Sequence, residues 1–301
     1  MNHNGLLIIM TLFFCFTVTI ADINAIHLAR GTGEAEGINQ KEMEVHFINV
    51  GQGDSTLVKT PNGKTMLIDG GPPSAGEKVV TYLKQQGVTS IDVLVATHPD
   101  IDHIGGLITV IKELNVKKII DSGKIYYTDT YFEYLKQIKD KDIPVSIAKS
   151  RSVIEVDSAV SFQVLNTFHW VESNNQSSLV FSLDYKQMDF LLMADVEIKQ
   201  EKKLIKTFNL QSEFLKVAHH GSVTSTSREF LEKVKPEKAI LSYSKDNHYG
   251  HPDPTIIENL QQAGATIYST AKAGDIVVTT NGYSYTIDVS GTKRLVYRSS
   301  S

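Results

Sequence analysis

The sequence predicts an α/β protein whose sheet is partly antiparallel. From Met43 onward, short runs rich in Val, Ile and Leu alternate with longer amphipathic runs, as expected for alternating strands and helices. Many strand-like runs are neighbouring pairs joined by short turns, which favours antiparallel pairing over a purely parallel sheet. The 301 residues are enough to form a core without disulfide bonds. We therefore expect one α/β domain over residues 42–301.

Strands are expected where four to eight β-favouring residues end at glycine or at a polar residue. VHFINV (45–50), TMLIDGG (65–71) and IDVLVATH (91–98) show this pattern near the start of the domain. The other expected strands are residues 117–120, 144–149, 161–166, 178–185, 189–194, 214–219, 238–244, 265–270, 275–280 and 283–289.

Helices are expected where apolar residues recur every three or four positions. GEKVVTYLKQQG, residues 76–87, has this spacing and closes on Gly87, which is typical of a helix C-terminus. The other expected helices are residues 107–114, 130–141, 195–206, 227–234 and 254–264.

The N-terminal segment predicts export. Residues 5–20, GLLIIMTLFFCFTVTI, form an apolar run that is short for a membrane span and has the size of a signal-peptide core, although no Lys or Arg precedes it. We expect residues 1–25 to be a signal peptide of a secreted protein, or alternatively an N-terminal anchor that holds the protein on the outer face of a membrane. Residues 26–41 are polar and contain several glycines, which predicts a flexible linker. Cys15 is the only cysteine and lies in the apolar run, so residues 26–301 offer no thiol for a disulfide or a metal.

One ten-residue motif concentrates metal-binding side chains. THPDIDHIGG, residues 97–106, places His98, Asp100, Asp102 and His103 in a loop just beyond an expected strand. Imidazoles and carboxylates interleaved this closely suit two divalent cations, because neighbouring side chains on a tight turn can point to different ions. The glycines at 105 and 106 are expected to let the backbone turn sharply into the next helix. A polar loop that merely caps a helix is the simpler interpretation, and four such residues so close together argue against it.

Further candidate ligands follow other expected strands. They are Asp69, Asp195, His219, His220, His248 and His251. Taken singly, a strand-end aspartate often caps a turn, and a histidine is more often structural than a ligand. Their recurrence at strand ends is informative, because a metal cluster needs ligands brought together from several strands.

Six motifs in a fixed order resemble one family. VGQGDS, LIDGG, THPDIDHIGG, NNQSSLVF, LKVAHHGS and YGHP are similar to motifs of the C-terminal hydrolase domain of the ComEC family of DNA-uptake proteins, within the metallo-β-lactamase superfamily of binuclear hydrolases. The resemblance covers about residues 45–278. It implies a four-layer αβ/βα sandwich with the metals at one edge of two sheets. The polytopic membrane region and the oligonucleotide-binding domain of full ComEC proteins have no counterpart here, so we expect a free-standing, exported relative and not the uptake channel.

The resemblance implies a ligand set for two ions that share one aspartate. The first ion would be held by His98, Asp100 and Asp195, and the second by Asp102, His103, Asp195 and His251. The second histidine of the usual HxHxDH motif is Asp100 here, and the segment where another histidine ligand is expected reads SNNQSSLV, which offers only Asn174 and Asn175. The first site would therefore be richer in oxygen, which suits Mn²⁺ better than a nitrogen-rich site does. We expect two divalent ions, either Zn²⁺ or Mn²⁺, with the first ion bound more weakly.

The resemblance also implies supporting and catalytic roles. Asp69 would orient the motif loop by hydrogen bonds, and Asp54 of VGQGDS would support the same loop. His219 and His220 of LKVAHHGS would donate a proton to the leaving group or clamp the substrate anion, and one of them could instead be a ligand. Asp102, His219 and His220 are thus the expected catalytic residues.

These features predict an exported metal-dependent hydrolase, most simply a phosphodiesterase or nuclease that acts on DNA or RNA through a metal-activated hydroxide. The net charge of -4 gives no general affinity for a polyanion, so such a substrate must be held locally. The aromatic residues between Lys117 and Lys139 have helical spacing, and we expect them in the core and not in a binding strip.

Two alternative functions remain open at this stage. One is a cell-envelope phosphodiesterase similar to phosphorylcholine esterases, and the other is a non-catalytic binding module that keeps the fold. A lactonase or β-lactamase is disfavoured by the missing histidine. No stable protein partner is expected, and a membrane is expected as a partner only if the N-terminal segment is retained.

Overall fold

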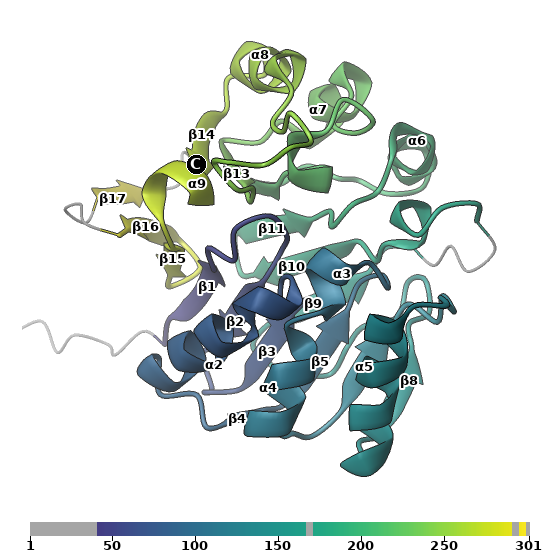
Figure 1. Ribbon diagram of the computed structural model, residues 1–301. Coiled ribbons are helices and arrows are strands. Elements are labelled where there is room, and N and C mark those ends of the chain that lie inside the picture. The colour runs from purple at the N-terminus through teal and green to yellow at the C-terminus, as the bar shows by residue number, and fades with distance from the viewer. Residues whose placement is uncertain (1–40, 167–170, 291–294, 299–301) are drawn as a thin grey trace, which may run out of the picture. The chain divides into compact units, whose positions relative to one another are not determined.

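The computed structural model describes residues 41–166, 171–290 and 295–298 (Figure 1). The signal peptide or anchor predicted for residues 1–25, and all but the last residue of the linker predicted for residues 26–41, lie outside this part of the chain. Among the described residues, no helix has both the length and the apolar character needed to cross a membrane.

The larger sheet of the described chain has nine strands in the order β17-β16-β15-β1-β2-β3-β5-β7-β8. Neighbours from β17 to β3 are antiparallel, and neighbours from β3 to β8 are parallel. The strands are β1 (Met43–Phe47), β2 (Thr56–Lys59), β3 (Thr65–Ile68), β5 (Val93–Ala96), β7 (Ile119–Asp121), β8 (Val145–Ile147), β15 (Ile276–Thr280), β16 (Ser284–Val289) and β17 (Leu295–Arg298).

The second sheet has six strands in the order β14-β13-β12-β11-β10-β9 within the same described ranges. Neighbours from β14 to β11 are parallel, and neighbours from β11 to β9 are antiparallel. The strands are β9 (Ser161–Val164), β10 (Phe181–Tyr185), β11 (Met188–Leu192), β12 (Phe214–Lys216), β13 (Lys238–Leu241) and β14 (Thr266–Ser269). The expectation of antiparallel parts is confirmed in both sheets. The short strands β4 (Ser90–Ile91) and β6 (Asn115–Val116) pair only with each other.

Helices cover the outer face of each sheet (Figure 1). On the larger sheet these are α2 (Gly76–Gln85), α4 (Leu107–Glu113) and α5 (Asp129–Asp140), whose apolar residues form one core cluster with the outward residues of the strands. On the second sheet they are α6 (Ile198–Thr207), α7 (Arg228–Val234) and α8 (Pro254–Gln262), which share another core cluster. The short elements are α3 (Ile101–Ile104), α9 (Thr270–Ala273), η1 (Pro73–Ala75), η2 (Asn175–Ser177) and η3 (Ala218–Gly221).

A third core cluster lies between the two sheets and contains residues of both. Strand β5 shows how one sequence run serves two cores: Val93 and Val95 belong to the cluster between the sheets, whereas Leu94 and Ala96 belong to the helix-covered cluster. Alternation of side chains along a strand produces this division, and it makes a strand that is buried on both faces apolar throughout. The layers are therefore helix, sheet, sheet and helix, so the predicted four-layer αβ/βα sandwich is confirmed.

Two glycines bring the motif loop close to neighbouring backbone. Gly106 has an ordinary helical φ of -71°, and a Cβ atom there would lie 1.9 Å from the carbonyl oxygen of Gly70. Gly105 has a helical φ of -60° as well, so the expectation of a sharp turn at this pair was wrong, and close packing is the reason for glycine. At Gly53, φ is +132° and a Cβ atom would lie 2.2 Å from the carbonyl oxygen of Asp102.

Candidate metal centre

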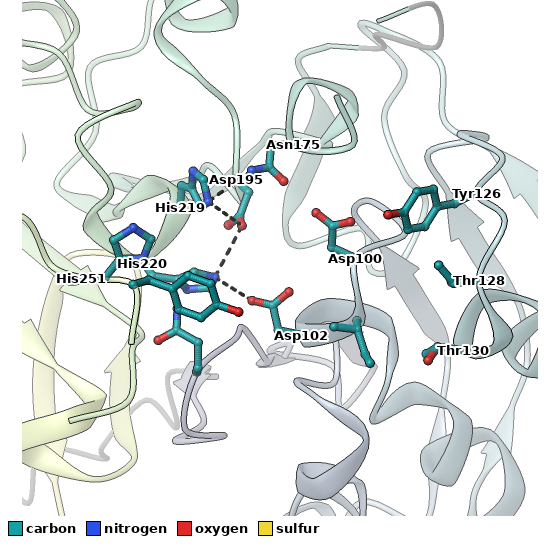
Figure 2. A pocket seen from close by; sticks show the side chains of 13 residues that line it. Asp100, Asp102, Tyr126, Thr128, Thr130, Asn175, Asp195, His219, His220 and His251 are labelled. Atoms are coloured by element: carbon teal, nitrogen blue, oxygen red, sulfur yellow. Dashed lines mark hydrogen bonds and ion pairs between the residues drawn. The ribbon is translucent and has the colours of Figure 1, made fainter. Parts of the chain in front are cut away.

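The candidate site lies where the C-terminal ends of strands from both sheets meet. Beyond β3 and β5 of the larger sheet come Asp69 and the THPDIDHIGG loop, and beyond β11 and β12 of the second sheet come Asp195 and the two histidines of η3. Figure 2 shows Asp100 and Asp102 between the histidines on one side and Tyr126, Thr128 and Thr130 on the other. The strand ends thus bring together the residues that the sequence placed in separate motifs.

Asp195 is the centre of this arrangement. Its Oδ2 atom lies 3.2 Å from Nε2 of His103, 3.5 Å from Nε2 of His220, 3.8 Å from Nε2 of His219 and 3.9 Å from Nε2 of His98. Burial raises the pKa of the Asp195 carboxyl, but the imidazoles of His220 and His103 lower it well below its ordinary value. One ionised carboxylate is therefore surrounded by four imidazoles.

Asp69 fixes the orientation of two of these histidines. Its Oδ2 atom lies 2.8 Å from Nδ1 of His103 and accepts a hydrogen bond of 2.7 Å from the hydroxyl of Thr97. Because a carboxylate only accepts, the His103 Nδ1 atom carries the hydrogen. The Thr97 hydroxyl has used its own hydrogen on Asp69, so it accepts from Nδ1 of His98 at 3.0 Å. Both rings therefore direct their Nε2 atoms to the cluster, and in the neutral ring this atom is unprotonated, which is the state a metal ligand requires.

His220 is oriented in the same way by different partners. Its Nδ1 atom donates to the backbone carbonyl of Ser242 at 2.9 Å, and its Nε2 atom, which is unprotonated when the ring is neutral, lies 3.3 Å from Oδ2 of Asp102. Beneath the ring, Asp54 forms a buried ion pair of 2.8 Å with Lys216, and its backbone N–H donates to the carbonyl of Asp102. Burial raises the pKa of Asp54, but Lys216 and His220 lower it below the ordinary value. Asp54 thus contacts the motif loop that it was expected to support.

The donor set fits divalent cations. Four buried atoms, Nε2 of His98, His103 and His220 and Oδ1 of Asp195, have no hydrogen-bond partner in the described part of the chain. Buried polar atoms are seldom left without a partner, so these atoms point to a ligand. Three overlapping groups have ligand atoms within 4.8 Å of one another: His98, His103 and Asp195; Asp102, His103 and His220; and Asp54, Asp195 and His220. Imidazole and carboxylate donors without thiolate suit Zn²⁺ or Mn²⁺.

The electrostatics also favour a cation. Burial lowers the pKa of His103 and His220, but Asp195 and the other nearby carboxylates raise the pKa of both rings well above the ordinary value. The negative charge that attracts a proton to these rings would equally stabilise a metal ion between them.

Two of the six expected ligands lie outside these groups. The Oδ2 atom of Asp100 lies 3.5 Å from Nε2 of His98, and its Oδ1 atom accepts a hydrogen bond of 2.6 Å from the side chain of Asn174. The ring of His251 lies in the wall of the pocket, with its centroid 5.5 Å from that of His219 and 6.3 Å from that of His220. His220, whose role the sequence left open, is the histidine that meets Asp102 and His103.

The loop that carries His219 and His220 has an unusual backbone. Both residues have positive φ, 48° and 54°, as does Thr226 with 55°. The buried Glu201 of α6 holds the far end of this loop, since its carboxylate accepts hydrogen bonds from the backbone N–H groups of Thr226 and Ser227. Such backbone strain persists only where surrounding contacts enforce it, and it often marks functional sites.

A pocket of about 420 Å³ opens over this cluster. Its lining includes Asp100, Asp102, Asp195 and the three histidines 219, 220 and 251, and none of its lining residues is lysine or arginine. Tyr126 and Tyr249, 38% and 72% exposed, also line it. The aromatics between Lys117 and Lys139 are therefore only partly in the core: Tyr131 and Tyr134 are buried, whereas Tyr126, Tyr127 and Phe132 are exposed.

Several contributing residues were not identified from the sequence. Asn174 and Asn175, noted only as poor ligands, hold Asp100 and His219 respectively, the latter at 3.2 Å. Lys216 and Glu201 were not singled out. A signal was available for Lys216, because a lysine inside the apolar strand FLK must be paired if it is buried. Glu201 offered no such signal, since alternating charges are ordinary on an amphipathic helix.

Comparison with known proteins agrees with this geometry. Residues 48–245 match the metallo-β-lactamase superfamily. The chain is 31% identical over 254 residues to ComE operon protein 3 of Bacillus subtilis (strain 168), covering 78% of this chain and 33% of that protein. It is 28% identical over 247 residues to Recombination protein 2 of Haemophilus influenzae, covering 80% of this chain and 29% of that protein. The chain thus spans about a third of the length of the curated relatives it matches.

A solved structure shares the fold at low identity. CmlA, a diiron β-hydroxylase from Streptomyces venezuelae, superposes with a TM-score of 0.51 at 13% identity, over 75% of this chain and 52% of that chain. A likeness at this identity concerns the fold alone. With the fold, the strand-end ligands and the superfamily match in agreement, the chain belongs to the metallo-β-lactamase superfamily of metal-dependent hydrolases, and within it resembles the ComEC family.

Proposed function

We propose that the protein is an exported, metal-dependent phosphodiesterase that cleaves nucleic acid. The observation that carries this proposal is the convergence on Asp195, whose Oδ2 atom lies within 3.9 Å of Nε2 atoms from four histidines. Divalent ions held there would supply a hydroxide at neutral pH and would neutralise charge on phosphoryl oxygens. A cluster that served only for stability would not need to open into a pocket of about 420 Å³.

We assign the tighter ion site to Asp102, His103, Asp195 and His220, and the weaker site to His98 and Asp195 with Asp100 nearby. This assignment places His220 where the family resemblance had suggested His251. It is supported by the orphaned Nε2 atom of His220, 3.3 Å from Asp102 and 3.5 Å from Asp195.

His219 is the histidine best placed to give a proton to the departing oxygen. It lines the pocket and lies outside the three ligand groups. Its Nδ1 atom lies 3.1 Å from the hydroxyl of Thr224, and its Nε2 atom, on the side of Asn175 and the pocket, accepts a hydrogen bond of 3.2 Å from the Asn175 amide. Nε2 must therefore first take up a proton before it can give one to the departing oxygen. His251 would contact substrate from the adjacent wall.

Two features support nucleic acid as the substrate. The exposed tyrosines at the pocket, Tyr126 and Tyr249, offer flat surfaces on which unpaired bases can stack. The name of one relative, Recombination protein 2, refers to recombination, a process that acts on DNA.

A phosphorylcholine ester is the second candidate substrate. Aromatic rings close to carboxylates also suit a quaternary ammonium group, and Tyr126 and Tyr249 line the same pocket as Asp100 and Asp102. A substrate panel separates the two candidates.

The test is a cleavage assay with purified protein reloaded with Mn²⁺ or Zn²⁺. The panel holds single- and double-stranded DNA and RNA, bis(p-nitrophenyl) phosphate and a phosphorylcholine ester. We expect nucleic acid to be cleaved, and activity to fall at least about a hundredfold in Asp102→Asn, because even an outer partner of a metal ligand is worth 10–100-fold. The control is Lys139→Gln, which replaces an exposed residue of α5. Cleavage of the phosphorylcholine ester alone would favour the second candidate, and bound metal without any turnover would indicate a non-catalytic module.

Export is a separate part of the proposal, supported by the apolar run at residues 5–20. Expression of the full chain followed by N-terminal sequencing of protein from the medium and the membrane fraction tests it. Recovery only from the cytoplasm with residue 1 intact would contradict export.

A further inference from the structure

We infer that a second pocket beside the metal centre binds the phosphate backbone of a nucleic-acid strand whose reacting bond lies in the first pocket. This inference rests on the proposed function and adds a binding site to it. The second pocket has a volume of about 550 Å³, and it is lined by residues 123–125, residues 171–172, Gln176, Lys199 and Lys203.

The charge of this pocket is opposite to that of the protein. Among the described residues, three lysines, Lys124, Lys199 and Lys203, line it together with one acidic residue, Glu172, although the whole chain has a net charge of -4. Among the described residues, the Lys199 side chain has no hydrogen-bond or ion-pair partner. Its ammonium group is therefore available to a phosphate.

The basic character continues along the exposed face of α6. Lys199, Lys202, Lys203 and Lys206 are all exposed, whereas the one acidic residue of this helix, Glu201, points inward and is buried. A strand leaving the pocket over α6 would therefore meet four lysines and no exposed acidic side chain on this helix.

The first pocket cannot supply this charge. Apart from two tyrosines, its ionisable lining residues in the described part of the chain are carboxylates and histidines, without lysine or arginine. Metal ions would neutralise the carboxylates and the reacting phosphate, but the flanking phosphates of a polymer would remain unpaired. A polymeric phosphodiester thus needs cations outside the first pocket, whereas a small diester does not.

The two pockets are neighbours along two segments of chain. Tyr126 lines the first pocket and Ile125 the second, and Asn175 lines the first and Gln176 the second. Since consecutive Cα atoms are about 3.8 Å apart, only the width of one residue separates the pockets at each crossing. Ile125 and Tyr127, 64% and 81% exposed, offer apolar surface to unpaired bases at this boundary.

The second pocket is also held in place by its own hydrogen bonds. Gln176 Nε2 donates to Glu197 at 2.8 Å, and Ser173 Oγ donates to the same carboxylate at 3.3 Å. Lys124 Nζ donates to the carbonyl of Val171 at 2.8 Å, which ties the two walls together. The lysines therefore line a pocket whose walls are held together by hydrogen bonds, and they are not only part of an exposed helix face.

The experiment measures binding without turnover. Fluorescence anisotropy of a labelled single-stranded 15-nucleotide DNA is recorded in EDTA at several salt concentrations for the wild type, Lys199→Gln/Lys203→Gln and the control Lys139→Gln/Lys233→Gln. The control removes the same charge from exposed positions on α5 and α7, outside both pockets. We expect the Kd of the pocket variant to rise about tenfold. We also expect the plot of log K against log salt concentration to become less steep by about 1.4, because two phosphate contacts of a single strand contribute about 0.7 each to the magnitude of its slope. We expect the control variant to match the wild type.

Turnover of the metal-loaded protein separates this inference from the proposed function. The pocket variant is expected to keep its kcat and KM for bis(p-nitrophenyl) phosphate while its KM for the oligonucleotide rises about tenfold. If the pocket variant cleaved the oligonucleotide and bound the labelled DNA with the same Kd as the wild type, the second site would be overturned and the proposed function would stay intact. Binding that depends on Lys199 and Lys203 without any cleavage would support the site and contradict the nuclease. An equal loss in the control variant, or no binding in the wild type, would overturn the inference.

Discussion

Among single residues, the hydrogen bonds at Nδ1 determine how each histidine takes part in the site. His98, His103 and His220 each donate Nδ1–H to a fixed acceptor, and all three leave Nε2 free toward Asp195. The sequence indicated the first two as ligands because they share one motif. The family resemblance gave His251 as a ligand and His220 as a catalytic residue that could instead be a ligand. Both follow parallel strands of one sheet, and the position of the His220 ring depends on the left-handed backbone at this residue, which the sequence does not show.

Metal content tests the choice between His220 and His251. His220→Asn is expected to lose at least one equivalent of bound metal, because its Nε2 atom lies 3.3 Å from Oδ2 of Asp102 and 3.5 Å from Oδ2 of Asp195. His251→Asn is expected to keep its metal. Asparagine is chosen because it tolerates the positive φ of 54° at position 220. The measurement is elemental analysis after gel filtration, with His219→Asn as a second control for the strained loop; greater metal loss in His251→Asn would contradict the assignment.

The ion pair between Lys216 and Asp54 joins the two sheets and is almost completely buried. Lys216 belongs to β12 of the second sheet, while Asp54 lies between β1 and β2 of the larger sheet, and the two are 2.8 Å apart. Lys216→Met is expected to lower the free energy of unfolding by about 3–5 kcal/mol, because it leaves a carboxylate buried without its partner. Urea denaturation in EDTA measures the change.

The double variant Lys216→Met/Asp54→Asn removes both charges and is expected to be more stable than Lys216→Met alone. Were the double variant the less stable of the two, the loss would come from packing around Lys216 and not from an unpaired charge.

At the scale of elements, the sequence indicated nearly all of the long helices and strands, for local reasons. The side chains of Thr128, Ser227 and Asp253 cap the N-termini of α5, α7 and α8. The capping residues and the spacing of the apolar residues therefore indicate the same three helices. The elements without a predicted counterpart are β2, β4, β6, β17, α3, α9, η1, η2 and η3. All of these have only two to four residues, which is too short for a periodic pattern, and their conformation depends on pairing and packing in the folded chain.

The hairpin of β10 and β11 contains a pH-sensitive pair. Asp184 and Asp189 face each other across it, and Glu213 is also near Asp189. Burial, together with these two carboxylates, raises the pKa of Asp189 to about 6. Because the pKa in the folded protein lies above the unfolded value of about 3.9, protonation of Asp189 stabilises the fold below about pH 4, and this stabilisation is lost as the pH rises through 6.

Asp189→Asn is therefore expected to melt at the same temperature as the wild type near pH 4 and higher at pH 7.5. After allowance for solvent screening, the gain at pH 7.5 is about 1 kcal/mol. Thermal denaturation in EDTA across this range checks it, with the exposed Asp140→Asn as control. A constant difference at all pH values would show that the effect is not one of charge.

For the molecule as a whole, the metal centre depends on the meeting of two sheets that have separate helix-covered cores. Asp102 and His103 come from the larger sheet, and Asp195 and His220 come from the second. The sequence could indicate that strand ends carry ligands. It could not show that Asp195 lies within reach of four histidines, because that distance is set by the packing of the core between the sheets.

Bound metal is therefore expected to stabilise the whole domain by linking both sheets. A ligand that binds only the folded state at a hundred times its Kd contributes about 2.7 kcal/mol. For a domain of this size that corresponds to a rise in Tm of about 5–10 °C. Differential scanning calorimetry with EDTA, Mn²⁺ and Zn²⁺ measures the rise, and Asp195→Asn is expected to lose most of it, whereas Lys139→Gln keeps it. If metal raised the Tm of Asp195→Asn as much as that of the wild type, the stabilising ion would bind elsewhere, and Asp195 would not be the residue that joins the two halves of the site.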